Sequence, residues 1–456
     1  MWVMAFEPRT PMRTPAVLCL LILVSWLFAV PFASAQEVAP AAVVATDSVD
    51  AVVAAPIEYR LPPDLLKKSE ALYRTRMLTY AVGTVYGIVL LILLLNFRIG
   101  ARFRDWAERA SPRRFVQALI FAPLLLLTID VLSLPDSIYR HSLAMSYGLS
   151  VQGWGSWFWD WTKNELIGIA IATLLIWGLY AILRRSPQRW WFYGWLATIP
   201  VLLLLVFVQP VFIDPLFNKF EPLAARQPQL MVELEKVIHR GGLTIDRSRM
   251  FEMRASDKVT TYNAYVTGIG ASKRVVVWDN TSRDLTIPQT MFVFGHEQGH
   301  YVLDHIWKGL AFASGGLLFV FYLCHRLIGG MIRRWGAQWG VRDGADWASF
   351  PVLLLIFTLA SIVAQPVVSG AVRYMEHEAD AYGLAIIDGL VPDSSKVAAQ
   401  AFQKLGEKGL AYPTPNPLWV WWAYDHPPIA ERVRFAAAYK TLTGAKKHSE
   451  GEDLAR

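Results

Sequence analysis

One short segment combines residue types that can bind a metal ion and activate a water molecule. His296 and His300 are four positions apart, and Glu297 follows the first histidine, in the pattern HExxH. On a helix, side chains four positions apart project from one face, so both imidazoles can reach one ion while the glutamate points at a water on that ion. Two imidazoles at this spacing are typical of zinc. The segment therefore predicts a Zn²⁺ site with His296 and His300 as ligands and Glu297 as the general base.

A catalytic zinc takes three protein ligands and keeps a fourth position for water, so another ligand must come from elsewhere in the chain. The best source is residues 373–380, which read Arg-Tyr-Met-Glu-His-Glu-Ala-Asp. Glu376 and Asp380 share a helical face, so we expect Glu376 to bind the metal and Asp380 to hydrogen-bond a ligand histidine. Arg373, three positions before Glu376, can pair with it.

Four other residues compete for a place at this site. His377 lies one position off the expected stripe, and Glu378 faces about 160° away from it, so both are weaker candidates for the third ligand. His305 falls at the far end of the zinc face of a continuous helix, and we expect it to be structural or interfacial. His426, in Asp-His-Pro-Pro, either belongs to a turn before a helix or binds substrate.

The elements before the motif are predicted to be a small sheet and a capped helix. Thr286, with Gln289 three positions later and Pro288 in the first turn, marks the start of a helix that runs through His300. Residues 229–240 have helical periodicity and end at a glycine pair.

Three segments read as strands: residues 250–255, 263–267 and 274–279, the last two joined by a turn containing Gly268 and Gly270. A strand beside the metal can hold a substrate peptide as an added strand. We expect Asn263, Ala264 and Tyr265 to bind substrate in this way, although ordinary membership of the sheet explains the strand equally well.

The composition places this catalytic segment in a membrane protein. Of the 456 residues, 54% are hydrophobic and 18% are charged, and the mean hydropathy is +0.32. Apolar runs long enough to span a bilayer recur at 77–97, 115–134, 165–183, 190–210, 309–324 and 347–368. The fold expected is a mainly α-helical polytopic membrane protein with a small α+β zincin-like catalytic domain.

The runs divide the chain into six parts. Residues 1–35 read as a signal peptide, or as a first membrane helix, and residues 36–76 as a linker. Four spans fill residues 77–211, a catalytic segment 212–306, a membrane hairpin 307–370, and a second catalytic segment 371–456.

The positive charges indicate an orientation rather than a nucleic-acid partner. Residues 98–114 contain six arginines against one aspartate and one glutamate, and the short connections 184–189 and 326–342 contain three and four arginines. Short connections rich in arginine stay in the cytoplasm, so the catalytic segments are expected outside, in the periplasm of a bacterial inner membrane. Because the arginines lie in the connections between spans, nucleic-acid binding is not expected.

The whole pattern resembles the integral-membrane CAAX prenyl protease type 1 family and its bacterial membrane protease relatives. The resemblance spans roughly residues 60–440 and is carried by residues 215–223, 263–268 and 273–279, HExxH at 296–300, RxxExxAD at 373–380, and Asp-His-Pro-Pro at 425–428. It implies one zinc ion on His296, His300 and Glu376, with Glu297 as the general base and Asp380 as a supporting residue or proton donor. It also implies peptide-bond hydrolysis in membrane-associated, CAAX-like or misfolded proteins.

Three alternatives remain open. Eukaryotic members of that family act on the cytosolic side, which opposes the orientation that the arginines indicate. A non-catalytic membrane scaffold or chaperone-like module with a structural zinc would need four ligands, and the sequence offers no convincing fourth. A site-2 type intramembrane protease would carry its motif in a spanning helix, whereas here the motif follows a sheet and contains Gln298.

Overall fold

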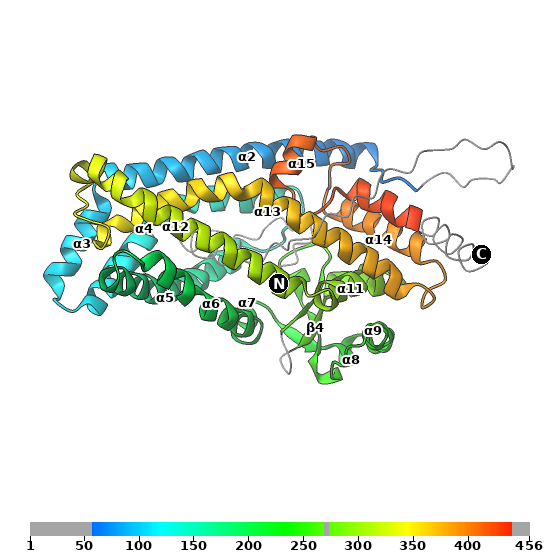
Figure 1. The fold of residues 1–456 in the computed structure, drawn as a ribbon. Helices are drawn as coiled ribbons and strands as arrows, with labels where there is room; N and C mark the ends of the chain where they lie inside the picture. Colours follow the sequence, from blue (N-terminus) through cyan, green and yellow to red (C-terminus); the bar gives the residue numbers. More distant parts are fainter. Residues whose placement is uncertain (1–56, 269–272, 440–456) are drawn as a thin grey trace, which may run out of the picture.

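A computed structural model describes residues 57–268 and 273–439 (Figure 1). The predicted signal peptide, residues 36–56 of the predicted linker and part of the turn between Gly268 and Gly270 lie outside these residues. A bundle of long helices forms one end of the molecule, and the small sheet with its covering helices forms the other.

Five of the described helices are long and apolar enough to cross a membrane. They are α2 (Pro63–Asn96), α4 (Arg114–Ser146), α5 (Trp154–Arg185), α12 (His305–Trp339) and α13 (Phe350–Ile387), the last preceded by a short turn at Trp347–Ser349. A sixth candidate, α6 (Trp190–Val208), continues through a π-helical turn (Gln209–Ile213) into α7 (Asp214–Phe217), and the pair is bent by 43°. The bend coincides with Pro210, which lacks a backbone N–H for the helical ladder. The mainly α-helical, polytopic fold is thus confirmed.

The helices extend beyond the apolar runs that predicted them. Helix α2 begins at Pro63, so residues 63–76 are helical and do not belong to the linker expected there. Proline in the first turn and the Leu, Lys and Glu residues that follow favour a helix, while the charged residues among them keep the segment from reading as an apolar run. Helix α13 continues unbroken to Ile387, so the boundary expected at residue 370 falls inside one helix. Hydropathy locates the part of a helix that lies in lipid and not its ends.

The sheet has four described strands, one more than the sequence predicts. They are β1 (Phe220–Pro222), β2 (Met250–Met253), β3 (Ala264–Thr267) and β4 (Arg274–Trp278). Their order is β1-β2-β4-β3, with β2 and β4 parallel and the other two pairs antiparallel. Strand β1 has only three residues and ends in proline, too short for a period-two pattern. Strand β3 lies at an edge of the sheet.

The motif helix α11 (Ile287–Val302) lies between the sheet and the other helices of the catalytic portion. It contacts β3, α9 (Pro228–Arg240), α13 and α14 (Ser394–Lys408). The predicted capping box is present, since Thr286 and Gln289 satisfy each other's backbone N–H groups. Short helices α8 (Leu223–Arg226), α10 (Asp279–Asp284) and α15 (Pro417–Ala423) and a helix at 429–439 complete this portion.

The three arginine-rich connections gather at the end of the bundle away from the sheet, around the short helix α3 (Ile99–Ala110) (Figure 1). Arg98 donates to the carbonyl of Gln338 at 2.8 Å, which joins the first connection to the third. Arg184, at the start of the second connection, lies with its guanidinium 4.2 Å from the Trp347 ring. All three therefore lie on one side of the bundle, as a common cytoplasmic face requires.

Two glycines allow α11 and α13 to approach closely. A Cβ on Gly383 of α13 would lie 2.9 Å from the backbone nitrogen of His296, and one on Gly295 of α11 would lie 2.7 Å from the Cγ2 of Ile386. A methyl group against a backbone atom cannot be accommodated by a rotamer change, so the two helices would have to separate.

We predict that Gly383→Ala lowers the melting temperature, at a cost of about 1–3 kcal/mol from overpacking, and lowers metal content because His296 moves away from α13. Gly315→Ala is the matched control, because a Cβ there meets nothing within 4 Å. Metal analysis and thermal unfolding of both purified variants test this. Equal metal content in the two would show that the close approach is not needed at this site.

Candidate active site

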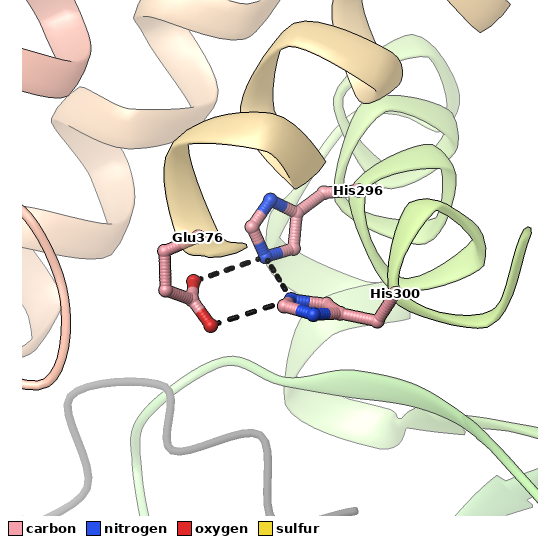
Figure 2. Close-up of side chains that lie close together, drawn as sticks. All are labelled: His296, His300 and Glu376. Carbon is pink, nitrogen blue, oxygen red and sulfur yellow. Dashed lines mark hydrogen bonds and ion pairs between the residues drawn. The ribbon is translucent and has the colours of Figure 1, made fainter. Parts of the chain in front are cut away.

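Three buried side chains from two helices converge on one point (Figure 2). His296 and His300 point from α11, and Glu376 points toward them from α13. The Nε2 atoms of the two histidines are 3.2 Å apart. Glu376 places Oε2 3.3 Å from His296 Nε2 and Oε1 3.3 Å from His300 Nε2.

These separations fit the coordination sphere of zinc. A tetrahedral ion with metal–ligand distances of about 2.0–2.1 Å holds neighbouring ligand atoms about 3.3–3.4 Å apart. Two imidazoles and one carboxylate are also the donor set of a catalytic zinc. Burial lowers the pKa of His296, but its hydrogen bonds to Asp380 and Glu376 outweigh burial and raise the pKa to about 10. The surroundings therefore favour a positive charge at the His296 ring. The three side chains therefore fit a divalent cation.

Asp380 orients the first of the two histidines. Its Oδ1 lies 2.8 Å from His296 Nδ1, on the side of the ring away from Glu376. Arg432 holds the same carboxylate with two hydrogen bonds, Nη2 to Oδ1 at 2.6 Å and Nε to Oδ2 at 2.8 Å. Both oxygens are thus taken by charged or ring N–H donors, so the carboxylate is held ionised and fixes the tautomer of His296.

The sequence analysis missed Arg432. It lies in the helix at 429–439, four positions after Pro428, and its guanidinium is 4.4 Å from the Phe402 ring. The sequence does show an arginine on the helix that follows Asp-His-Pro-Pro. Its spacing from residues 373–380 does not indicate that it pairs with a carboxylate there. Arg373, expected to pair with Glu376, instead donates to the backbone carbonyls of Val420 and Tyr424.

Glu297 lies in the wall of a pocket beside the three donors. It is 2% exposed, and its Oε2 has no hydrogen-bond partner among the described residues. Burial raises the pKa of Glu297 to about 8, although the charge of His296 opposes this shift. A cation at the donors would favour the carboxylate further. A buried acceptor that faces a pocket next to a metal site can take a proton from a water held there.

The pocket also brings together the residues expected to bind substrate, though not all of them. Asn263 and His426 line it, whereas Ala264 is fully buried in the sheet and Tyr265 is half-buried. His426 Nε2 is 3.2 Å from Glu376 Oε2, and its Nδ1 is 3.0 Å from Asp425 Oδ1. Apolar side chains form much of the remaining wall: Phe292, Val293, Phe402, Leu405 and Ile429.

The competing third ligands point elsewhere. The His377 ring packs against Phe435 with centroids 4.4 Å apart. Glu378 Oε2 is 3.3 Å from His305 Nε2. His305 does not continue the motif helix, because α11 ends at Val302 and α12 begins at His305 itself. Its Nδ1 is nevertheless 3.0 Å from His300 Nδ1.

Two family models match consecutive parts of the chain. A family model described as the CAAX prenyl protease N-terminal region, with five membrane helices, matches residues 46–219. The model of peptidase family M48 matches residues 224–440. An uncharacterized metalloprotease of Bacillus subtilis is 32% identical over 82% of this chain and 86% of its own length. The chain belongs to peptidase family M48. The expected resemblance to CAAX prenyl proteases is confirmed, and the chain is a membrane metalloprotease.

More distant relatives match by sequence, and one solved structure matches by fold. The yeast CAAX prenyl protease 1 of Saccharomyces cerevisiae is 25% identical over 82% of this chain and 88% of its own. The human CAAX prenyl protease 1 homolog is 24% identical over 76% of this chain and 78% of its own. The crystal structure of S. mikatae Ste24p superposes with a TM-score of 0.69 at 24% identity and covers 82% of this chain and 88% of that one. That likeness shows a common fold.

We predict that Glu376→Gln lowers zinc content well below one ion per chain, because an amide oxygen is a far weaker ligand than a carboxylate. His377→Gln is the control, since the ring packs on Phe435 and away from the donors. Elemental analysis of both proteins after dialysis checks this. Normal zinc in Glu376→Gln together with loss in His377→Gln would move the third ligand by one residue.

Proposed function

We propose that this membrane metalloprotease is a zinc-dependent endopeptidase with His296, His300 and Glu376 as ligands and Glu297 as the general base. The observation that carries the proposal is the set of donor separations, 3.2 to 3.3 Å, beside a buried carboxylate oxygen that faces a pocket. A bound Zn²⁺ would lower the pKa of a coordinated water and polarise a substrate carbonyl.

The chain's own residues supply the proton transfers. Glu297 accepts a proton from the attacking water and returns it to the leaving amine nitrogen as the peptide bond breaks. Asp380 keeps His296 in the tautomer with its proton on Nδ1, and it is proposed as a positioning residue rather than a proton donor because Arg432 and His296 occupy both of its oxygens. His426 lies in the pocket wall with Nδ1 on Asp425 and Nε2 3.2 Å from Glu376 Oε2. Burial lowers the pKa of His426, but the charges of Glu376 and Asp425 outweigh burial and raise the pKa, which favours the doubly protonated ring. In that form its Nε2–H can be donated to a substrate oxygen.

The edge strand β3 gives the pocket a means of binding an extended peptide. Added strands bind through the backbone, which makes the site tolerant of sequence, while the apolar wall formed by Phe292, Phe402 and Ile429 accepts one apolar side chain. These two properties suit unfolded or extended segments of membrane-associated proteins, among them CAAX-like carboxyl termini and misfolded chains. The buried position of Ala264 is compatible with this role, because strand addition uses backbone groups.

The alternative of a closed, structural zinc is not supported by the donor set. Within the described ranges, the group of side chains able to share one ion contains three residues, His296, His300 and Glu376, and His426 does not join it. Three protein donors leave room for a water, as a catalytic site requires.

We predict that Glu297→Gln abolishes proteolysis while the protein keeps its zinc, because the base is lost and the three ligands remain. The rate should fall by about 10²-fold or more, the usual contribution of general base catalysis. Cleavage of a peptide library in detergent, with zinc measured on the same sample, tests this. Unchanged turnover in zinc-loaded Glu297→Gln would disprove the proposed mechanism.

We also propose that the active site faces the periplasmic side of a bacterial inner membrane. An alkaline phosphatase fused after Arg456 should be active, and one fused to the chain truncated after Ser111 should be inactive, because the arginine-rich connection stays in the cytoplasm. Fluorescent protein fusions at the same two points should give the reverse pattern. Bright fluorescence after Arg456 would invert the orientation and leave the zinc assignment unchanged.

A further inference from the structure

A second pair of side chains lies behind the zinc donors, on the side of His300 away from Glu376. His305 is 3% exposed and places its Nδ1 3.0 Å from His300 Nδ1. Its Nε2 is 3.3 Å from Glu378 Oε2. The other oxygen of Glu378 accepts a hydrogen bond from the Tyr374 hydroxyl at 3.3 Å.

The break between α11 and α12 creates this contact. Asp304 adopts a left-handed conformation with φ of 58°, so the chain turns sharply between Val302 and His305. In a continuous helix, side chains five positions apart are about 140° apart around the axis and do not meet. The turn brings the two rings to a centroid distance of 5.1 Å.

The hydrogen-bond chemistry permits one arrangement of protons when Nε2 of His300 binds a metal. The ring must then carry its proton on Nδ1 and donate it to the facing nitrogen of His305. His305 accepts at Nδ1, so its own proton sits on Nε2 and is donated to Glu378. In this arrangement each contact pairs one N–H donor with one acceptor, and no two protons face each other.

We propose that His305 and Glu378 are positioning residues for the metal site, a role that rests on the proposed function. They hold His300 in its Nδ1–H tautomer and fix the plane of its ring, as Asp380 does for His296. The two ligand histidines are thus held by different partners, one by a carboxylate directly and the other through a second imidazole. Glu378 takes part in the site by accepting the hydrogen bond from His305 and not as a metal ligand.

Two simpler roles do not fit the contacts. A histidine that only fills space would not place both ring nitrogens on polar partners, at 3.0 and 3.3 Å. A substrate-binding histidine would line the pocket, and His305 is absent from its wall. Orientation of a ligand by its other ring nitrogen is the usual second contact of metal-bound histidines, and its loss weakens metal binding by about 10 to 100-fold.

The test compares His305→Phe with His305→Asn in the full-length, detergent-purified protein. Phenylalanine fills the volume of the ring without an acceptor, whereas the side-chain oxygen of asparagine can accept the proton from His300. We expect His305→Phe to weaken Zn²⁺ binding about 10 to 100-fold in competition with a chelator, and His305→Asn to recover most of the loss. The visible spectrum of the Co²⁺-loaded protein should change in His305→Phe and stay near wild type in His305→Asn.

Glu378→Gln provides an independent variant if His305→Phe does not fold. It keeps an acceptor but loses the charge, so binding should weaken by about tenfold. Wild-type zinc affinity and Co²⁺ spectra in His305→Phe, or in Glu378→Gln if that variant alone folds, would overturn the proposal. The proposed function fails separately, if Glu297→Gln still cleaves peptides. A wild-type chain that binds no Zn²⁺ would overturn both.

Discussion

The site depends on how closely two helices cross. The histidines come from α11 and the carboxylates from α13, and the side chains meet only because Gly295 and Gly383 let the two backbones approach. Donor separations of 3.2 to 3.3 Å leave little tolerance, since a shift of about 1 Å would place Glu376 outside the coordination sphere. Much of the catalytic core, including Phe292, Phe294 and Phe402, packs around this crossing.

The same crossing joins the active site to the membrane helices. Helix α13 is continuous from the start of its apolar part to Ile387, so the helix that carries Glu376 is itself a candidate span. Helix α12, also a candidate span, begins at His305, whose ring contacts His300. Two candidate membrane helices therefore carry or contact the side chains of the candidate metal site. A rigid element gives more precise placement of a ligand than a loop does.

Charge is balanced locally at the centre of the site. Glu297, Glu376 and Asp380 are all buried, and Arg432 supplies a buried cation in contact with Asp380 and 3.8 Å from Glu376. A buried carboxylate without such partners would take up a proton. Arg432 therefore allows Asp380 to remain an acceptor for His296, and a metal would complete the balance for Glu376. Asp380 contacts His296 and His305 contacts His300, so the two histidines have separate hydrogen-bond partners.

The sequence by itself determined the features that follow from local spacing. HExxH and the four-residue interval from Glu376 to Asp380 place side chains on helical faces, the capping box at Thr286 starts the motif helix, and the apolar runs mark the spans, because all of these depend on neighbours a few positions apart. Only the tertiary structure decided which helical faces pack against each other. Arg432 reaches Asp380 across 52 positions, and Glu378 reaches His305 across 73. The turn at Asp304 overrides the continuous helix that the spacing of His305 suggests. Such contacts depend on the packing of α11, α12 and α13, and no local pattern encodes that packing.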